Sequence, residues 1–104
     1  MRGELLKGNL DLLLLAILAD GPAHGYAVVA QLRRRSDSVL DLPEGTIYPA
    51  LHRLEAAGLL TSRWSTEAGR RRRTYSLSRR GRAALEERRT EWSDFTNAVA
   101  AVIA

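Results

Sequence analysis

An apolar segment, NLDLLLLAILA at residues 9–19, limits what the chain can fold into. As a helix, this segment is apolar nearly all round, so other elements have to cover it on several sides. It is far shorter than the roughly 20 residues that span a bilayer, and no signal-peptide cleavage site of the usual form follows it. We therefore expect a buried helix in a soluble, cytoplasmic protein, capped at Asn9 or Asp11 and preceded by a looser turn at Leu5 and Leu6.

The size and charge of the chain narrow its class. With 104 residues it can form one small domain, whose thin core would gain burial from oligomerisation. It has no cysteine, which excludes disulfides and thiol chemistry, and its two histidines alone do not suggest a metal site. The formal net charge of +4 favours an anionic partner. Ten arginines stand against three glutamates in residues 63–89, so the positive charge gathers in the second half of the chain.

A second helix is predicted over residues 23–36, where Tyr26, Val29 and Leu32 fall three residues apart on one face. This spacing indicates that Tyr26 packs mainly in the core. Three arginines at positions 33–35 close the helix, where cations suit the negative end of the helix dipole. The next seven residues are predicted to form a loop.

A third helix follows from Ile47, Leu51 and Leu54, which recur at helical spacing. Pro49 can be tolerated only in a first turn, so this helix should begin near residue 45 or 46 and end at Gly58. With the apolar stripe facing the core, the opposite face presents polar and small side chains. These are Pro49, His52, Arg53 and Ala56, with Thr46 and Tyr48 on the flanks.

Two short strands joined by a turn come next. Residues 59–65 and 71–77 alternate as half-buried strands do, and residues 66–69, TEAG, have turn chemistry. The run GRRRR at residues 69–73 therefore lies at the tip and on the return strand of a β-hairpin, a position that disfavours a nuclear-import tag. Because alternate strand residues point to opposite faces, only a subset of the four arginines can meet one partner, and the sequence does not say which.

The last predicted helix begins after an N-cap at Ser78 and carries an apolar seam that Arg88 interrupts. A domain of this size cannot cover the whole seam, so we expect a two-fold homodimer with this helix in the interface. The seam residues repeat with the spacing of a coiled coil and are Leu85, Trp92, Phe95, Val99 and Val102.

The expected fold is mostly α with a small β-hairpin, in the order of a winged helix-turn-helix followed by a long helix. We assign residues 1–78 to a DNA-binding winged-helix domain and residues 79–104 to a dimerisation helix. In such domains the third helix enters the major groove of double-stranded DNA, and the hairpin, or wing, touches the flanking backbone or minor groove.

This arrangement predicts which side chains contact DNA. Arg53, beside His52, could pair with guanine, Pro49 could contact a thymine methyl group, and Thr46 or Tyr48 could bind a phosphate. An ordinary solvated face is the alternative for this helix, and for about half of the wing arginines. Phosphate contacts with a strong salt dependence would come from Arg70, Arg71, Arg72 and Arg73.

The sequence also resembles a known family over about residues 6–92. It contains KGNLDLLLLAILADGPAHGYAVVAQL, LPEGTIYPALHRLEAAGLL and GRRRRTYSL in the order and spacing of the PadR family of transcriptional regulators. The resemblance implies a bacterial or archaeal winged-helix repressor that binds operator DNA as a homodimer. The chain is similar to the short members, which lack a large C-terminal domain.

The resemblance also implies roles for single residues in DNA binding and dimerisation. Tyr26 would lie near the DNA backbone, and the first helix, with Leu5 and Leu6, would join the last helix in the dimer interface. Two aromatic residues usually follow the basic run of the wing. Here Thr74 replaces the first, which leaves Tyr75 as the aromatic contact.

A small aromatic effector is a further implication of the resemblance. In relatives, aromatic residues at the dimer interface line a pocket for planar aromatic compounds, a role that Trp92 and Phe95 would take here. The alternative is that Trp92 simply anchors the dimer core.

Two other classes of protein compete with a DNA-binding regulator. An enzyme is disfavoured, because the chain has no Ser-His-Asp or Cys-His set, no phosphate-binding G-x-x-x-x-G-K and no G-x-G-x-x-G after a strand. We expect no catalytic residue and no cofactor. A basic module that binds an acidic protein or RNA stays open, and it predicts only weak, sequence-independent binding to duplex DNA.

Overall fold

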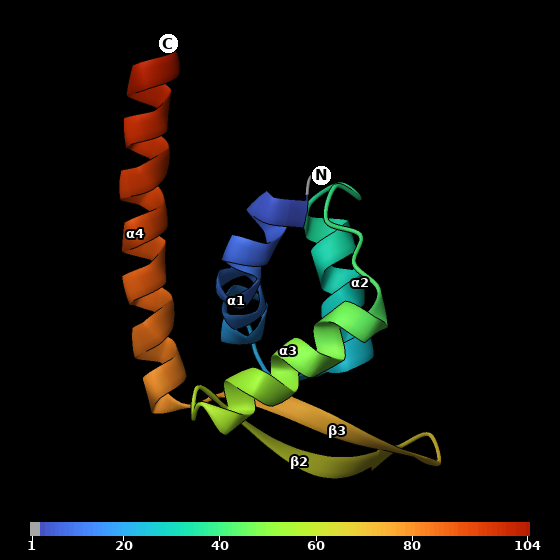
Figure 1. The fold of residues 1–104 in the computed structure, drawn as a ribbon. Coiled ribbons are helices and arrows are strands. Elements are labelled where there is room, and N and C mark those ends of the chain that lie inside the picture. Colours follow the sequence, from blue (N-terminus) through green and yellow to red (C-terminus); the bar gives the residue numbers. More distant parts are fainter. Residues whose placement is uncertain (1–2) are drawn as a thin grey trace.

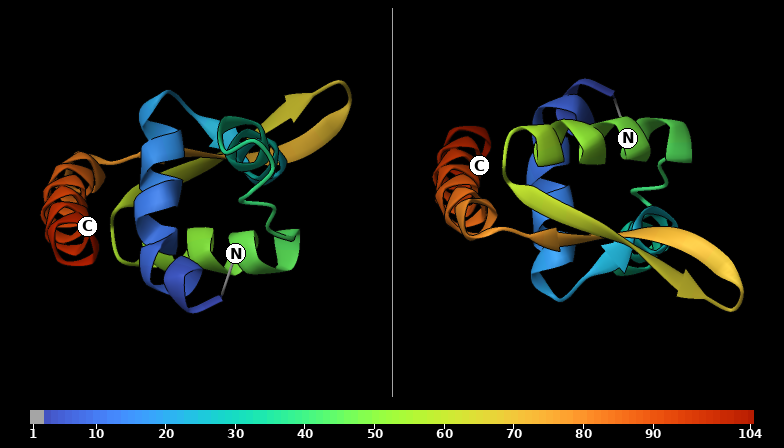
Figure 2. Two further views of the ribbon diagram at one scale, coloured as in Figure 1. Left: turned by 90° about the horizontal axis from the view of Figure 1, so that it is seen from above. Right: turned by 90° about the horizontal axis from the view of Figure 1, so that it is seen from below.

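The computed structural model describes residues 3–104, in which α1 lies between α2 and α4, and α3 crosses beside a small sheet (Figure 1). Helix α4 and the tip of the β2–β3 hairpin lie at opposite sides of the molecule (Figure 2). This order confirms the predicted winged helix-turn-helix with a long last helix. The elements are α1 (Gly3–Ala19), β1 (Ala23–His24), α2 (Gly25–Arg35), α3 (Glu44–Ala56), β2 (Leu60–Glu67), β3 (Arg70–Leu77) and α4 (Arg79–Ile103).

The apolar segment that defines α1 is covered on several sides, as predicted. Helices α2, α3 and α4 and strand β3 all contact it. In the part of the chain from residue 3 onward, no helix has both the length and the apolarity needed to cross a membrane. The most deeply buried side chains come from α1, α2, α3 and β3 and are Leu14, Leu15, Leu18, Val28, Ile47, Leu51, Leu54 and Tyr75.

Helix α1 begins earlier than expected, so the predicted cap at Asn9 or Asp11 is wrong. Both residues lie inside the helix, and Asn9 donates from Nδ2 to the carbonyl oxygen of Leu5 at 2.7 Å. The preceding residues include good helix formers, which extend the helix backwards beyond the apolar segment.

The second helix begins at Gly25, two residues later than predicted, because residues 23 and 24 belong to the sheet. Ala23 and His24 form β1, which pairs antiparallel with Tyr75 and Thr74 of β3. This pairing joins segments about fifty residues apart, so no local sequence pattern predicts it. His24 also caps α2, because its Nδ1 atom accepts a hydrogen bond from the backbone N–H of Ala27 at 3.2 Å.

Helix α3 contains Pro49 in its second turn, so the expectation that this proline must lie in a first turn is wrong. Pro49 has no N–H to donate to the carbonyl of Gly45, but both residues are exposed, where water can serve that carbonyl. The helix ends at Ala56, and the chain turns away at Gly58, whose φ of +82° suits glycine. Leu59 donates back to the Leu54 carbonyl at 3.0 Å.

The wing is a hairpin with a two-residue turn, and both strands are longer than predicted. Ala68 and Gly69 have φ values of +50° and +76°, the positive values that a type I′ turn requires. The resulting register places Trp64 opposite Arg73 and Thr66 opposite Arg71 on one face of the hairpin. Arg70 and Arg72 belong to the other face.

Helix α4 starts as predicted after Ser78, whose Oγ accepts a hydrogen bond from the Gly81 N–H at 3.0 Å. Leu85 is only 2% exposed and packs in the core of its own chain. Its assignment to a dimer interface is therefore wrong, because α1 and the sheet already cover the first turns of α4. The later turns extend past α1 (Figure 1).

Candidate nucleic-acid interface

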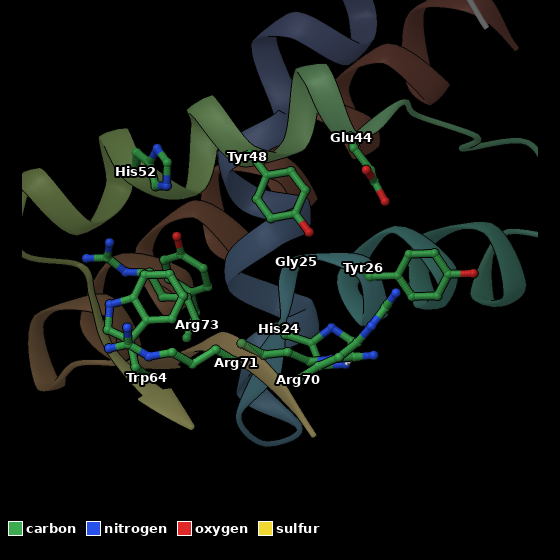
Figure 3. A pocket seen from close by; sticks show the side chains of 12 residues that line it. His24, Gly25, Tyr26, Glu44, Tyr48, His52, Trp64, Arg70, Arg71 and Arg73 are labelled. Carbon is green, nitrogen blue, oxygen red and sulfur yellow. Dashed lines mark hydrogen bonds between the residues drawn. The ribbon is translucent and has the colours of Figure 1, made fainter. Parts of the chain in front are cut away.

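A groove of about 750 Å³ lies between the start of α2, one flank of α3 and the wing (Figure 3). Arginine and aromatic side chains dominate its walls, with a single carboxylate contributed by Glu44. Its lining residues are His24, Gly25, Tyr26, Glu44, Tyr48, His52, Trp64, Arg70, Arg71, Arg72, Arg73 and Tyr75.

The groove brings together most, but not all, of the residues predicted to contact DNA. From α3 it includes Tyr48 and His52, which lie on the flank facing the wing. Thr46 and Arg53 lie on the opposite flank, and Pro49 occupies the exposed surface between the two flanks. The exposed surface of α3 therefore has two polar flanks separated by small residues.

Arg53 is exposed but is held by α1. Its Nη1 and Nη2 atoms donate to the two carboxylate oxygens of Asp11 at 3.0 and 2.8 Å, a bidentate pair. Arg88 of α4 approaches the same carboxylate at 3.8 Å. The hydrogen bonds from Arg53 hold the pKa of Asp11 below its usual range, with the charges of both arginines adding to the effect and burial opposing it.

Replacing Asp11 with asparagine is expected to lower the free energy of unfolding by about 1 kcal/mol at pH 7, since the exposure of Arg53 screens the pair. A depressed carboxyl pKa stabilises the fold above the unfolded-state pKa, near 4, and this stabilisation is lost as the pH falls through the folded-state pKa. The difference between the two proteins should therefore vanish in acid. Urea unfolding at pH 7, 4 and 2.5 measures it, and an equal difference at all three pH values would contradict the assignment.

Arg73 points toward its own domain. Its Nε donates to Ser62 Oγ at 2.7 Å and its Nη2 to Glu55 Oε1 at 3.1 Å. The Ser62 hydroxyl in turn donates to the same carboxylate. Arg73 is therefore neutralised within the domain and is the wing arginine least available to an external anion.

The other three wing arginines form no ion pair with any acidic side chain from residue 8 onward. Arg70 is exposed at the tip, and the Arg71 guanidinium lies over the ring of Trp64, 4.8 Å from its centroid. Arg72 Nη1 lies 2.7 Å from Nε2 of His24. A neutral imidazole has one acceptor nitrogen, and Nδ1 of His24 already caps α2, so the contact with Arg72 competes with that cap.

The positions of two tyrosines reverse the predictions made for them. Tyr75 is 1% exposed, and burial raises the pKa of its hydroxyl, so it is a core residue and not the predicted aromatic DNA contact. Tyr26 is 61% exposed and lines the groove, so its assignment mainly to the core is wrong. Helix α2 begins only at Gly25 and buries Val28 and Leu32, which turns Tyr26 outward.

Sequence reasoning missed Trp64, Glu44 and Glu55 as residues of this region. Strand alternation predicts that Trp64 shares a face with Leu60 and Ser62 on its strand. It likewise predicts that Arg73 shares a face with Tyr75 and Leu77 on the next strand. Pairing these two faces across the hairpin would have brought the ring and the guanidinium together. The ion pair between Glu55 and Arg73 has no comparable local signal.

A separate apolar face runs along the second half of α4. Phe95 is 58% exposed, Trp92 and Val102 are also exposed, and Val99 is half-buried. Trp92 and Phe95 border a small cavity of about 190 Å³ between α1 and α4. On α1, Leu5 is exposed and Leu6 is half-buried.

The three helices, the wing and the basic groove between them define a winged-helix protein with the charge pattern of a nucleic-acid-binding domain. The chain belongs to the transcriptional regulator PadR-like family, whose profile matches residues 14–87. This confirms the resemblance noted in the sequence. The family consists of transcriptional regulators, which also confirms that the protein is not an enzyme.

Relatives agree in sequence and in fold. The chain is 42% identical over 86 residues to the transcriptional regulator Rv3488 of Mycobacterium tuberculosis, covering 83% of this chain and 78% of the relative. A PadR family regulator from Clostridium difficile has 33% identity and a TM-score of 0.83, covering 92% of this chain and 99% of the other. Bacillus subtilis PadR, solved in complex with operator DNA, shares the fold at a TM-score of 0.69 and 23% identity, covering 75% and 45%.

Proposed function

We propose that this PadR family regulator is a repressor that binds a palindromic operator as a homodimer in the cytoplasm. The observation that carries the proposal is the groove, which sets the exposed flank of α3 beside three wing arginines that have no acidic partner among residues 8–104. Residues 1–78 would form the DNA-binding domain and residues 79–104 the dimerisation helix; the first two residues lie outside the described part of the chain.

In this proposal α3 reads the major groove from its exposed surface. His52 and Pro49 are best placed for base edges, and Tyr48 and Thr46 would bind phosphates from the two flanks. Arg53 reaches a base only if it leaves Asp11, so its contribution to affinity is reduced by the ion pair that it must give up.

The wing would bind the DNA backbone through Arg70, Arg71 and Arg72, which all line the groove although they come from both faces of the hairpin, while Arg73 stays with Glu55. Each phosphate that an arginine neutralises releases counterions, so binding should weaken steeply with salt. Tyr26 would contact the same backbone from the start of α2, since its exposed ring lines the groove. Bacillus subtilis PadR, which shares the fold, was solved in complex with operator DNA, and this supports DNA as the partner.

A homodimer is supported by the uncovered apolar face of α4. Trp92, Phe95, Val99 and Val102 would pack against a second copy, with Leu5 and Leu6 of α1 at the edge of the interface. A two-fold axis through this interface would hold two copies of α3 about one DNA turn apart, roughly 34 Å, over a palindromic site.

A small aromatic effector is also part of the proposal, and its support is one small cavity bordered by two aromatic rings. Trp92 and Phe95 border the cavity between α1 and α4, and their ring centroids are 6.3 Å apart. At about 190 Å³ this cavity is smaller than the ~300 Å³ at which ligand pockets begin. An effector site would therefore need the second copy to complete it.

The proposal is tested with the DNA upstream of the protein's own gene and competitor DNA. Arg71→Gln should weaken binding to operator and scrambled duplex alike, and should lower the salt slope of log K by about 1. His52→Ala should instead reduce the preference for operator, by roughly tenfold, because it removes a side chain beside the bases. His52 is a cleaner probe than Arg53, which also supports the fold through Asp11. Fluorescence anisotropy over a range of salt concentrations measures both effects.

Arg63→Gln serves as a matched control, because Arg63 carries the same charge on the neighbouring strand but does not line the groove. Arg63→Gln should change the salt slope less than Arg71→Gln does, and the operator preference less than His52→Ala does. Weak binding of the unaltered protein to all duplexes would favour the alternative function, a basic module for RNA or an acidic protein. Equal losses on all sequences from both variants would show that α3 is not the reading element.

A further inference from the structure

Trp64 is an apolar residue that contributes nothing to the core. Its side chain is 54% exposed on β2, on the face of the wing that borders the groove. Register places it directly opposite Arg73, with Arg71 two residues further along the neighbouring strand. A large aromatic ring kept in this position on a hairpin calls for an explanation other than burial.

We propose that Trp64 is a positioning residue that holds Arg71 ready for a DNA phosphate; the inference rests on the DNA-binding function proposed above. Both arginines lie over the same ring, with the guanidinium carbons of Arg71 and Arg73 at 4.8 and 5.8 Å from its centroid. These distances lie within the range of cation–π attraction.

The two arginines differ in what else holds them. Arg73 is fixed by Ser62 and Glu55, so it forms a rigid neighbour for the ring. Arg71 has no ion pair with the described acidic side chains of residues 8–104, and its contact with Trp64 is the restraint that the structure gives it. Glu55 therefore fixes Arg73, Arg73 packs against the Trp64 ring, and the ring in turn restrains Arg71.

Such a stack helps an arginine to bind phosphate. An arginine on an exposed hairpin samples many rotamers, and ordering it on binding costs conformational entropy. Stacking uses the flat face of the guanidinium and leaves the N–H donors at its edge available for a phosphate. Trp64 restrains the side chain before DNA arrives, without neutralising its charge.

A double-mutant cycle on operator affinity tests this role. Trp64→Leu should weaken binding about two- to five-fold, the strength of an exposed cation–π contact, and Trp64→Phe should recover part of the loss. The salt slope of Trp64→Leu should match that of the unaltered protein, because the number of charges at the interface does not change. In an Arg71→Gln background, Trp64→Leu should have no further effect.

Equal effects of Trp64→Leu in both backgrounds would overturn the inference, since Trp64 would then contact DNA itself or act only through the fold. Absence of operator binding by the unaltered protein would instead overturn the proposed function, so the two failures are distinguishable. Thermal unfolding shows whether each variant is folded under the conditions of the binding measurements.

A second measurement covers the case in which Trp64→Leu does not fold. In a Trp92→Phe background, Trp64 is the sole tryptophan, and Arg71→Gln should increase quenching of its fluorescence by acrylamide in the absence of DNA. Unchanged quenching would show that Arg71 does not cover the ring, and the inference would fail.

Discussion

Phe95→Asp is expected to convert the proposed dimer to a monomer and to weaken operator binding on the order of 100-fold or more. The ring is exposed in a single chain, in the middle of the apolar face of α4. A carboxylate there would have to be desolvated between two copies of the helix, which is costly. Losing the dimer removes the gain from binding two half-sites at once. Analytical ultracentrifugation at micromolar concentration and anisotropy with operator DNA measure the two effects.

Asn97→Asp is the matched control for this substitution. It adds the same negative charge two residues away, and the helical rotation places it on the opposite side of α4. It should leave both the oligomeric state and the operator affinity nearly unchanged. A protein that sediments as a monomer before any substitution would contradict the proposed dimer directly.

Gly81→Ala is expected to lower the free energy of unfolding by about 3 kcal/mol, the upper end of typical overpacking costs. Gly81 is buried in the first turn of α4, and a Cβ atom there would overlap the backbone carbonyl oxygen of Leu59. That oxygen accepts a hydrogen bond from the Ser78 N–H at 3.1 Å, so it cannot move aside without breaking the junction between β3 and α4. Urea unfolding at a fixed protomer concentration measures the change.

The control is Gly45→Ala in the first turn of α3. A Cβ at Gly45 meets open space, so alanine should raise the stability slightly through its better helix propensity, by up to about 1 kcal/mol. If the two alanine substitutions change the free energy of unfolding in opposite directions, the close approach of α4 to Leu59 is the cause of the loss at Gly81. Equal effects would contradict it.

The features that followed from the sequence are those carried by local patterns. The all-round apolar surface of residues 9–19 required cover on several sides, and the periodicity of Ile47, Leu51 and Leu54 fixed which face of α3 is buried. Turn residues located the wing, and Ser78 marked the start of α4. Each of these depends on neighbours within about seven residues.

Errors arose where distant segments meet. The pairing of Ala23 with Tyr75 forms β1 and moves the start of α2, which turns Tyr26 outward. Leu85 fits the heptad spacing of an interface residue, yet the core of its own chain covers it. Arg53 lies on the predicted exposed face, but Asp11, 42 residues earlier, holds its guanidinium. Periodicity gives the direction of a side chain and not the partner that it meets.

The buried Tyr75 restricts how the wing can change in evolution, because it fixes which face of β3 meets the core. Strand faces alternate with each residue, so inserting a single residue between Arg73 and Tyr75 would exchange the faces of all four arginines. Arg72 would then replace Arg71 or Arg73 beside Trp64, and Glu55 would lose its partner. Residues added at the tip of the hairpin would leave the stack and the ion pair in place, whereas a change of one residue between the stack and Tyr75 would break both.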